Sequence, residues 1–242
     1  MAATATFERN RLLALLSPAE FERLRRHLAV VEFEHHHVFQ SAGDESETAY
    51  FPLTSVVSLI VTDPDGRGVE IASVGREGVV GLPAVLAGAP AFSEVVQQVS
   101  GALAQIPMAT LRAEIARNGE LGLLMDRYAV GLLNQIGRQV ICLRLHAIES
   151  RAARWLLACQ DRVGRDDFTL TQDFFALMLG NTRPQVSLAA SALRRAGLID
   201  YRRGHITIRD REGLEAVSCD CYGMIRDGFS RVLGDGADPI GG

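Results

Sequence analysis

The residues best suited to chemistry form a short polar run near the C-terminal end of the chain. Thr182, Arg183 and Gln185 stand at the start of a segment whose apolar residues recur at helical spacing. Arginine can donate two hydrogen bonds to guanine and glutamine can pair with adenine, each worth roughly 1–3 kcal/mol of discrimination between bases. Backbone amides at a helix start also attract phosphate. The run therefore predicts a helix that reads DNA.

The charge around this run favours a nucleic-acid surface. The whole chain carries a net charge of −4, yet residues 183–211 contain seven arginines and two aspartates, a local charge of +5. A basic stripe on an acidic chain is typical of a surface that meets nucleic acid. The alternative is a small helical domain for protein contacts, which explains the charge less well.

Two short helices must position these residues. Thr171 can cap a helix over residues 172–179, and Thr182 can cap the next, with Pro184 in its first turn, where a missing N–H costs nothing. Gly180 supplies the sharp turn between them. This spacing predicts a helix-turn-helix whose second helix enters the major groove.

A basic hairpin follows the two helices. Residues 198–208 form two apolar strands around a turn at Gly204, which predicts a wing that contacts phosphates beside the groove. The predicted DNA-binding residues are Thr171, Gln172, Asn181, Thr182, Arg183, Gln185, Ser187, Leu188, Arg194, Arg202, Arg203 and His205.

Cysteines and histidines are the other candidates for chemistry. Cys142 and Cys159 stand in apolar helical segments and are expected in the core. Cys219 and Cys221 are weak candidates for metal binding or redox sensing, because neighbouring thiols can do either. Residues 35–37 are three histidines, but strand alternation would send the middle one to the opposite face, so no metal site is predicted there.

The N-terminal half has the pattern of many short strands separated by turns. The runs rich in β-formers are 30–33, 37–40, 49–51, 56–61, 69–74, 94–99 and 102–106. Strands this short and this close together predict an antiparallel, jelly-roll-like β-barrel. A short helix after Gly81 would lie within it.

Residues 119–146 predict one long helix that is apolar on more than one side. A second face suggests a partner helix from another subunit, with a purely intramolecular helix as the alternative. The predicted dimerisation residues are Leu121, Leu124, Met125, Tyr128, Leu132, Ile136, Val140 and Leu143.

The fold class is therefore α+β. The predicted divisions are a sensor-like barrel over residues 1–118, a dimerisation helix over 119–146, a winged helix-turn-helix over 147–230 and a flexible tail over 231–242. The chain has no apolar run near the roughly 20 residues that cross a bilayer, and no signal peptide is recognised, so a cytoplasmic protein is expected.

The chain resembles the Crp/Fnr family of bacterial transcription regulators over nearly its full length. The match is strongest over residues 170–208, and residues 50–52, 56–59 and 74–78 resemble the family's cyclic-nucleotide-binding barrel. Arg183 occupies the place of the family's first base-contacting arginine. The resemblance implies a glutamate where this chain has Pro184 and an arginine where it has Leu188, so a different target sequence is expected.

The resemblance does not carry over the family's cyclic nucleotide. Where the family has a Gly-Glu pair for the ribose and an Arg-Ser or Arg-Thr pair for the phosphate, this chain has Gly81-Leu82 and Phe92-Ser93. A buried phosphate without a cation costs several kcal/mol, so cAMP is not expected and no cofactor is predicted. The candidate effector pocket consists of Val80, Gly81, Leu82, Phe92, Ser93 and Ile136.

The predicted function is a homodimeric, non-enzymatic transcription regulator that binds a pseudo-palindromic site in double-stranded DNA, with RNA polymerase as a further candidate partner. Its effector would differ from cAMP, or regulation would need none. The alternatives are a cupin-like metalloenzyme, or a small-molecule-binding barrel with a helical interaction domain. The enzyme would need a further histidine and a carboxylate at metal spacing, which the sequence does not offer.

Overall fold

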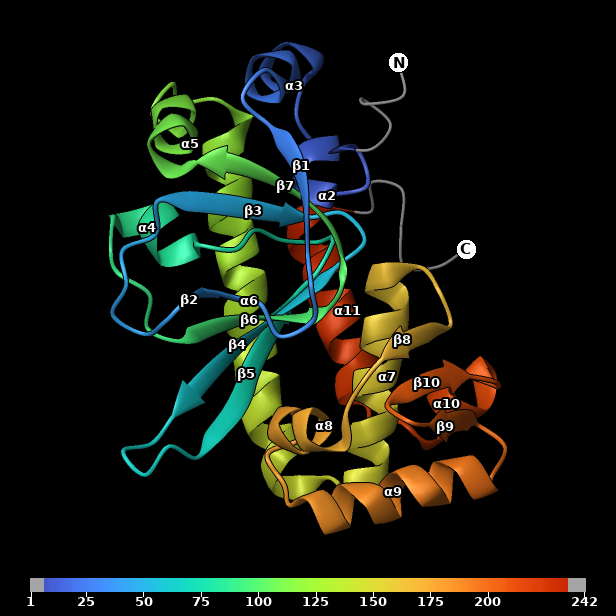
Figure 1. The fold of residues 1–242 in the computed structure, drawn as a ribbon. Helices are drawn as coiled ribbons and strands as arrows, with labels where there is room; N and C mark the ends of the chain where they lie inside the picture. Colours follow the sequence, from blue (N-terminus) through green and yellow to red (C-terminus); the bar gives the residue numbers. More distant parts are fainter. Residues whose placement is uncertain (1–6, 235–242) are drawn as a thin grey trace.

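The computed structural model describes residues 7–234. Figure 1 shows a sheet-rich N-terminal half and a helical C-terminal half, connected by one long helix. The helices are α2 (Arg11–Ala14), α3 (Pro18–Arg25), α4 (Leu82–Ala87), α5 (Met108–Ile115), α6 (Glu120–Leu145), α7 (Ile148–Val163), α8 (Gln172–Met178), α9 (Arg183–Arg195), α10 (Arg211–Val217) and α11 (Cys221–Leu233).

Seven strands form the N-terminal half. They are β1 (Ala29–Phe33), β2 (Val38–Gln40), β3 (Thr48–Pro52), β4 (Val56–Thr62), β5 (Gly68–Val74), β6 (Glu94–Val99) and β7 (Gly101–Pro107). They pair antiparallel in two sheets, of order β1-β7-β3 and β2-β6-β4-β5. The predicted α+β class and jelly-roll-like half are confirmed, but among the described strands no ladder joins the two sheets, so they form an open sandwich rather than a barrel. Alternating apolar residues fill its interior, with Phe51, Leu103 and Ile106 fully buried.

Helix α6 is covered on two sides within its own subunit. One side packs on the sandwich and the other on α11, which runs beside it in Figure 1. Tyr128 is fully buried, with its ring centroid 6.1 Å from that of Phe229 on α11. Gly131 permits this approach, because a Cβ there would lie 2.6 Å from the Phe229 ring. The long helix therefore forms part of both halves of the molecule.

The C-terminal half holds α7 to α11 and a small antiparallel sheet. Its strands are β8 (Asp167–Thr169), β9 (Ile199–Arg202) and β10 (His205–Ile208), in the order β8-β10-β9. Apolar residues of α7, α8 and α9 share one core that includes Leu157, Phe175, Val186 and Leu193. This core holds the two predicted helices at a fixed angle beneath the hairpin.

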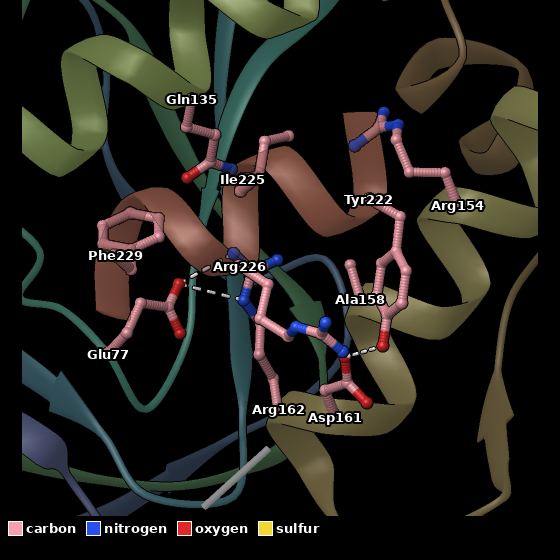
Figure 2. Close-up of a pocket in the computed structure, with 10 residues that line it drawn as sticks. All are labelled: Glu77, Gln135, Arg154, Ala158, Asp161, Arg162, Tyr222, Ile225, Arg226 and Phe229. Atoms are coloured by element: carbon pink, nitrogen blue, oxygen red, sulfur yellow. Dashed lines mark hydrogen bonds and ion pairs between the residues drawn. The ribbon is translucent and has the colours of Figure 1, made fainter. Parts of the chain in front are cut away.

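A buried ion pair joins the two halves. The Arg162 guanidinium of α7 lies 2.7 Å from the carboxylate of Glu77, in the loop after β5 (Figure 2). It also donates to Ser73 Oγ at 2.7 Å. Arg162 and Glu77 are 7% and 3% exposed. We call this group, Arg162 with Glu77 and Ser73, the interdomain ion pair. Beside it, Asp161 accepts from Tyr222 at 2.6 Å and pairs with Arg211 at 2.8 Å.

A second contact places α8 directly on the sandwich. Met178 Sδ lies 3.2 Å from Ser58 Oγ of β4, and Phe174 packs edge-on against His35 and His36. Gly180, which has φ +53°, faces β5, and a Cβ there would lie 2.8 Å from Val69 Cγ2. Glycine at this turn therefore permits both the left-handed backbone conformation and the close contact with β5.

Two sequence-based expectations need correction. Residues 35–36 form a turn rather than a strand, with His36 at φ +70°, and both rings contact Phe174 of α8. The predicted tail began at residue 231, but α11 continues to Leu233, which is 3% exposed and packs in the sandwich core. Residues 235–242 lie outside the described residues.

Among residues 7–234, no helix combines the length and the apolar character needed to cross a membrane.

The buried carboxyl group of Glu70 makes stability depend on pH. It accepts hydrogen bonds from Ser58 and Trp155, yet burial raises its pKa from 4.5 to about 7. Because the folded protein binds this proton more tightly than the unfolded chain does, the free energy of unfolding is highest below pH 4.5. It then falls as the pH rises through about 7. We expect Glu70→Gln to remove roughly 3 kcal/mol of this decline in the free energy of unfolding. Urea titrations at a series of pH values measure it.

The exposed Glu34→Gln provides the control and should follow the wild-type pH profile. A Glu70→Gln profile as steep as that of the wild type would contradict the prediction.

Candidate nucleic-acid interface and effector pocket

Helix α9 presents a free polar face. It lies across the base of the molecule in Figure 1 and buries Val186, Ala189, Ala190 and Leu193 against α7 and α8. Its opposite face and first turn are exposed, and the predicted residues exposed along the helix are Thr182, Arg183, Gln185, Leu188 and Arg194. The amphipathic pattern thus aims the polar first turn of α9 at solvent.

Arg183 is 62% exposed at the first position of α9. One of its nitrogens lies 3.4 Å from a carboxylate oxygen of Asp173, which is 73% exposed. An exposed pair of this kind contributes at most about 1 kcal/mol, so a ligand can displace it at little cost. The guanidinium is therefore available to an acceptor outside the protein.

The other polar residues of the turn organise the two helices. The Thr171 side chain accepts from the Phe174 amide and caps α8 as predicted. Thr182 lies at the N-cap of α9, but its hydroxyl donates to Gln185 Oε1 at 3.1 Å instead of capping the backbone. Ser187 donates to Gln172 at 2.8 Å, which ties α9 to α8. Asn181, half-buried, accepts from the Thr182 amide.

The predicted wing is a tight hairpin of β9 and β10. Both turn residues have positive φ, +50° at Arg203 and +79° at Gly204, as a two-residue type I′ turn requires. Arg202, Arg203 and His205 are exposed at its tip, Arg202 to 81%. Phosphate contact is the chemistry that such a tip can perform.

Arg195 was not among the predicted DNA-binding residues, although it is exposed on α9 like Arg194. Arg195 follows Leu188 by seven residues, so it continues the outer face of α9, and Arg194 lies about 100° further round. Helical spacing could have shown this. Arg211, counted in the basic stripe, is engaged with Asp161 and Glu215 at 2.8 and 3.0 Å. The basic surface is therefore smaller than the local sequence charge of +5.

A cavity of about 350 Å³ lies between the sandwich, α4 and α6. All six predicted pocket residues line it, namely Val80, Gly81, Leu82, Phe92, Ser93 and Ile136. Its other walls include Leu59, Val95, Ala129, Leu132 and Leu133, which sequence reasoning did not assign to the pocket.

The lining of this cavity is almost entirely apolar. Among the described residues Gln40 and Ser93 alone contribute polar side chains, and none of the lining residues is charged. An anion placed there would lose its hydration without a compensating cation. The cavity suits an uncharged, mainly apolar molecule.

The predicted dimerisation residues need a correction. Leu121, Leu124, Met125 and Tyr128 are at most 5% exposed within one subunit, and they pack in the sandwich core. Leu132 and Ile136 line the cavity, Leu143 is half-buried, and Val140 alone is largely exposed. The helix is apolar on several sides, so periodicity could not tell which side α11 and the sandwich would cover.

A different stripe of α6 is exposed. Leu123, Val130, Leu133 and Val140 are 60%, 55%, 68% and 64% exposed, and Gly137 lies between the last two. Their separations of seven, three, four and three residues follow a heptad pattern. We call this set the outer stripe of α6.

The weak candidates Cys219 and Cys221 lie next to Cys142 and His146, although the two pairs are far apart in sequence. Cys142 is buried as expected, and Cys159 is buried elsewhere, near Gln98.

Comparisons with known proteins agree with this geometry. Residues 30–118 match the cyclic nucleotide-binding domain family, and residues 150–217 match the Crp-like helix-turn-helix domain family. A search of curated sequences finds no significant match.

Solved structures of similar fold include three regulators. FixK2 from Bradyrhizobium japonicum has a TM-score of 0.67 at 18% identity, covering 79% of this chain and 98% of that one. A Crp/Fnr-family transcriptional regulator from Eubacterium rectale has a TM-score of 0.64 at 15% identity, covering 85% and 96%. The c-di-GMP responsive regulator CLP of Xanthomonas campestris has a TM-score of 0.61 at 16% identity, covering 79% and 99%.

The two domain matches span the sandwich and the helix-turn-helix, in the order in which the chain folds. The first turn of α9 and the wing are exposed, and they form the candidate DNA-binding surface of this domain. The chain is a DNA-binding transcription regulator and belongs to the Crp/Fnr family.

Proposed function

We propose that this regulator acts as a homodimer on a pseudo-palindromic DNA site and responds to an uncharged apolar molecule bound beside α6. The observation that carries the proposal is the position of α6, which has the cavity on one side and the outer stripe on another. One helix can therefore connect effector, partner subunit and DNA-binding half.

Arg183 is proposed to read a guanine and Gln185 an adjacent base. Both stand in the first turn of α9, the part of a recognition helix that meets base edges. Gln185 keeps its amide donors available, because its contact with Thr182 uses the oxygen. The wing arginines Arg202 and Arg203 would add phosphate contacts that carry no sequence information.

Dimerisation through the outer stripe is supported by its exposure and heptad spacing. Several large apolar side chains along one face of a helix are rarely left in water, and a heptad fits a partner helix. Two subunits paired along α6 would separate two recognition helices by about one DNA turn, roughly 34 Å. Contact with RNA polymerase stays a prediction.

The cavity is proposed to hold the effector and to act through α6. Ala129, Leu132, Leu133 and Ile136 of α6 form one wall, and Leu133 also belongs to the outer stripe. A ligand that moves this wall would shift the dimer contact and, through α7, the DNA-binding half. Such a ligand regulates only if it binds the two arrangements with different affinity.

Nothing in the described part of the sandwich favours the cupin-like enzyme. The side chains there form no group of three His, Cys, Asp or Glu at metal-binding distances. His35 and His36 instead pack on Phe174.

Arg183→Ala should weaken binding to the preferred site by roughly 5- to 150-fold, because a bidentate base contact is worth about 1–3 kcal/mol. Selection of bound sites from random duplex DNA, by wild type and variant, measures affinity and base preference. Arg26→Ala, at an arginine that is 71% exposed on the sandwich half, is the matched control. Identical selected sequences from wild type and Arg183→Ala would refute the base-reading role.

Val130→Glu with Val140→Glu should raise the dimer dissociation constant by at least roughly 100-fold, because carboxylates would be buried unpaired at the stripe. Sedimentation velocity measures the change. Val30→Glu, at a valine on β1 that is 47% exposed, should leave the dimer intact. A double variant that sediments like the wild type would place the dimer contact elsewhere.

The neutral dye N-phenyl-1-naphthylamine should bind the cavity and brighten, since it replaces water against apolar walls. Ala91→Trp, which fills the cavity, should reduce the affinity by about tenfold or more. Ala116→Trp, at the exposed C-cap residue of α5, is the control. Displacement of the dye by cAMP, or unchanged binding by Ala91→Trp, would contradict an apolar effector site.

A further inference from the structure

Three of the four cysteines meet one histidine at the end of α6. Cys142 and His146 stand one helical turn apart there, and Cys219 and Cys221 flank the turn between α10 and α11. The four side chains each offer one ligand atom, and all four atoms lie within 4.8 Å of one another. Residues 77 positions apart in sequence are brought together by the packing of α11 on α6.

The spacing of the ligand atoms fits a single tetrahedral metal ion. The sulfurs of Cys142 and Cys219 are 3.6 Å apart, and the sulfur of Cys221 is 3.7 Å from Nδ1 of His146. Zinc bonds of about 2.3 Å to sulfur and 2.0–2.1 Å to nitrogen give tetrahedral edges of about 3.6–3.8 Å. Both distances therefore fall close to the edges of a zinc tetrahedron.

The donor set selects among metals. Three thiolates and one imidazole form a soft, four-coordinate set that suits zinc, whereas calcium and magnesium prefer oxygen ligands. An iron–sulfur cluster would place several atoms between the ligand sulfurs, and these lie too close together for that. A mononuclear zinc ion is the occupant that satisfies both chemistry and distance.

The surroundings resemble a closed structural site. Cys142, Cys219 and Cys221 are 1%, 8% and 2% exposed, which leaves little access for water as a ligand. Zinc with three thiolates carries one net negative charge, and the buried guanidinium of Arg154 beside Cys142 can balance it. Its Nε has no hydrogen-bond partner among the described residues, so a thiolate would supply an acceptor.

We propose that Cys142, His146, Cys219 and Cys221 bind one zinc ion that fastens α11 and the α10–α11 turn to the end of α6. Directly after His146 the chain enters α7, so the ion would sit at the junction of the dimer helix and the DNA-binding half. The ion would fix the orientation of α7 relative to the end of α6. The site is independent of the effector cavity, which lies along the middle of α6.

The test is the zinc content of the full-length protein, purified under reducing conditions and measured by mass spectrometry of the metal. Wild type should hold about one zinc per chain, and Cys142→Ser and Cys221→Ser should fall below about 0.2. Cys159→Ser is the matched control, because Cys159 is equally buried but lies outside the cluster, and it should keep its zinc.

Three further measurements distinguish the loss of a zinc ligand from a loss of metal caused by misfolding. His146→Cys supplies a four-cysteine set and should retain about one zinc per chain. Cobalt in place of zinc should give the intense visible bands of tetrahedral thiolate coordination in wild type and in Cys159→Ser. Removal of zinc from the wild type by a chelator should lower its melting temperature by several degrees, since structural zinc contributes folding free energy.

The proposal is overturned if reduced wild type holds less than about 0.2 zinc per chain after zinc supplementation, or if Cys159→Ser loses as much metal as Cys142→Ser. A weak, octahedral cobalt spectrum would overturn it as well. Because zinc content is measured without DNA, failure of the regulator proposal leaves this result unaffected.

Discussion

The ion pair between Arg162 and Glu77 is the contact on which the arrangement of the two halves depends. It connects α7, which begins the DNA-binding half, to the loop after β5 of the sandwich. Both groups are almost fully buried. Removal of one partner would leave the other as an unpaired buried charge and would lower the free energy of unfolding by about 3–5 kcal/mol. The pair raises the pKa of Arg162 although burial opposes this. Ser73 and Gly75 keep the carboxylate and guanidinium aligned.

This contact gives α6 its role, because the helix passes between the two halves that the pair holds together. Gln135 and Gln139 of α6 donate to backbone oxygens of Ser73 and Glu70, so the same strand that leads to Glu77 is bound to α6. A change at the cavity wall can therefore reach the DNA-binding half by a short route of packed side chains.

The predictions from local sequence patterns agree best with the structure for features that interactions between neighbouring residues determine. The strand bounds matched the alternating runs to within about two residues, because alternation reflects which face of a sheet is buried. The six residues of the candidate pocket, which came from the family resemblance, line one cavity in the structure. The exposed stripe of α6 could not be predicted in this way, because apolar residues lie on several sides of the helix. One side is covered by α11, which begins 75 or more residues later in the chain.

By itself, then, the sequence determined the helix-turn-helix with its wing, the strand-rich half and the absence of charge from the pocket. Caps, glycine turns and side-chain alternation act over a few residues, so they can be recognised without a fold. Only the tertiary structure decided that the sandwich stays open, which stripe of α6 reaches solvent, and that Cys142 and His146 meet Cys219 and Cys221. Those outcomes depend on contacts between segments far apart in the chain, where no local preference specifies the partner.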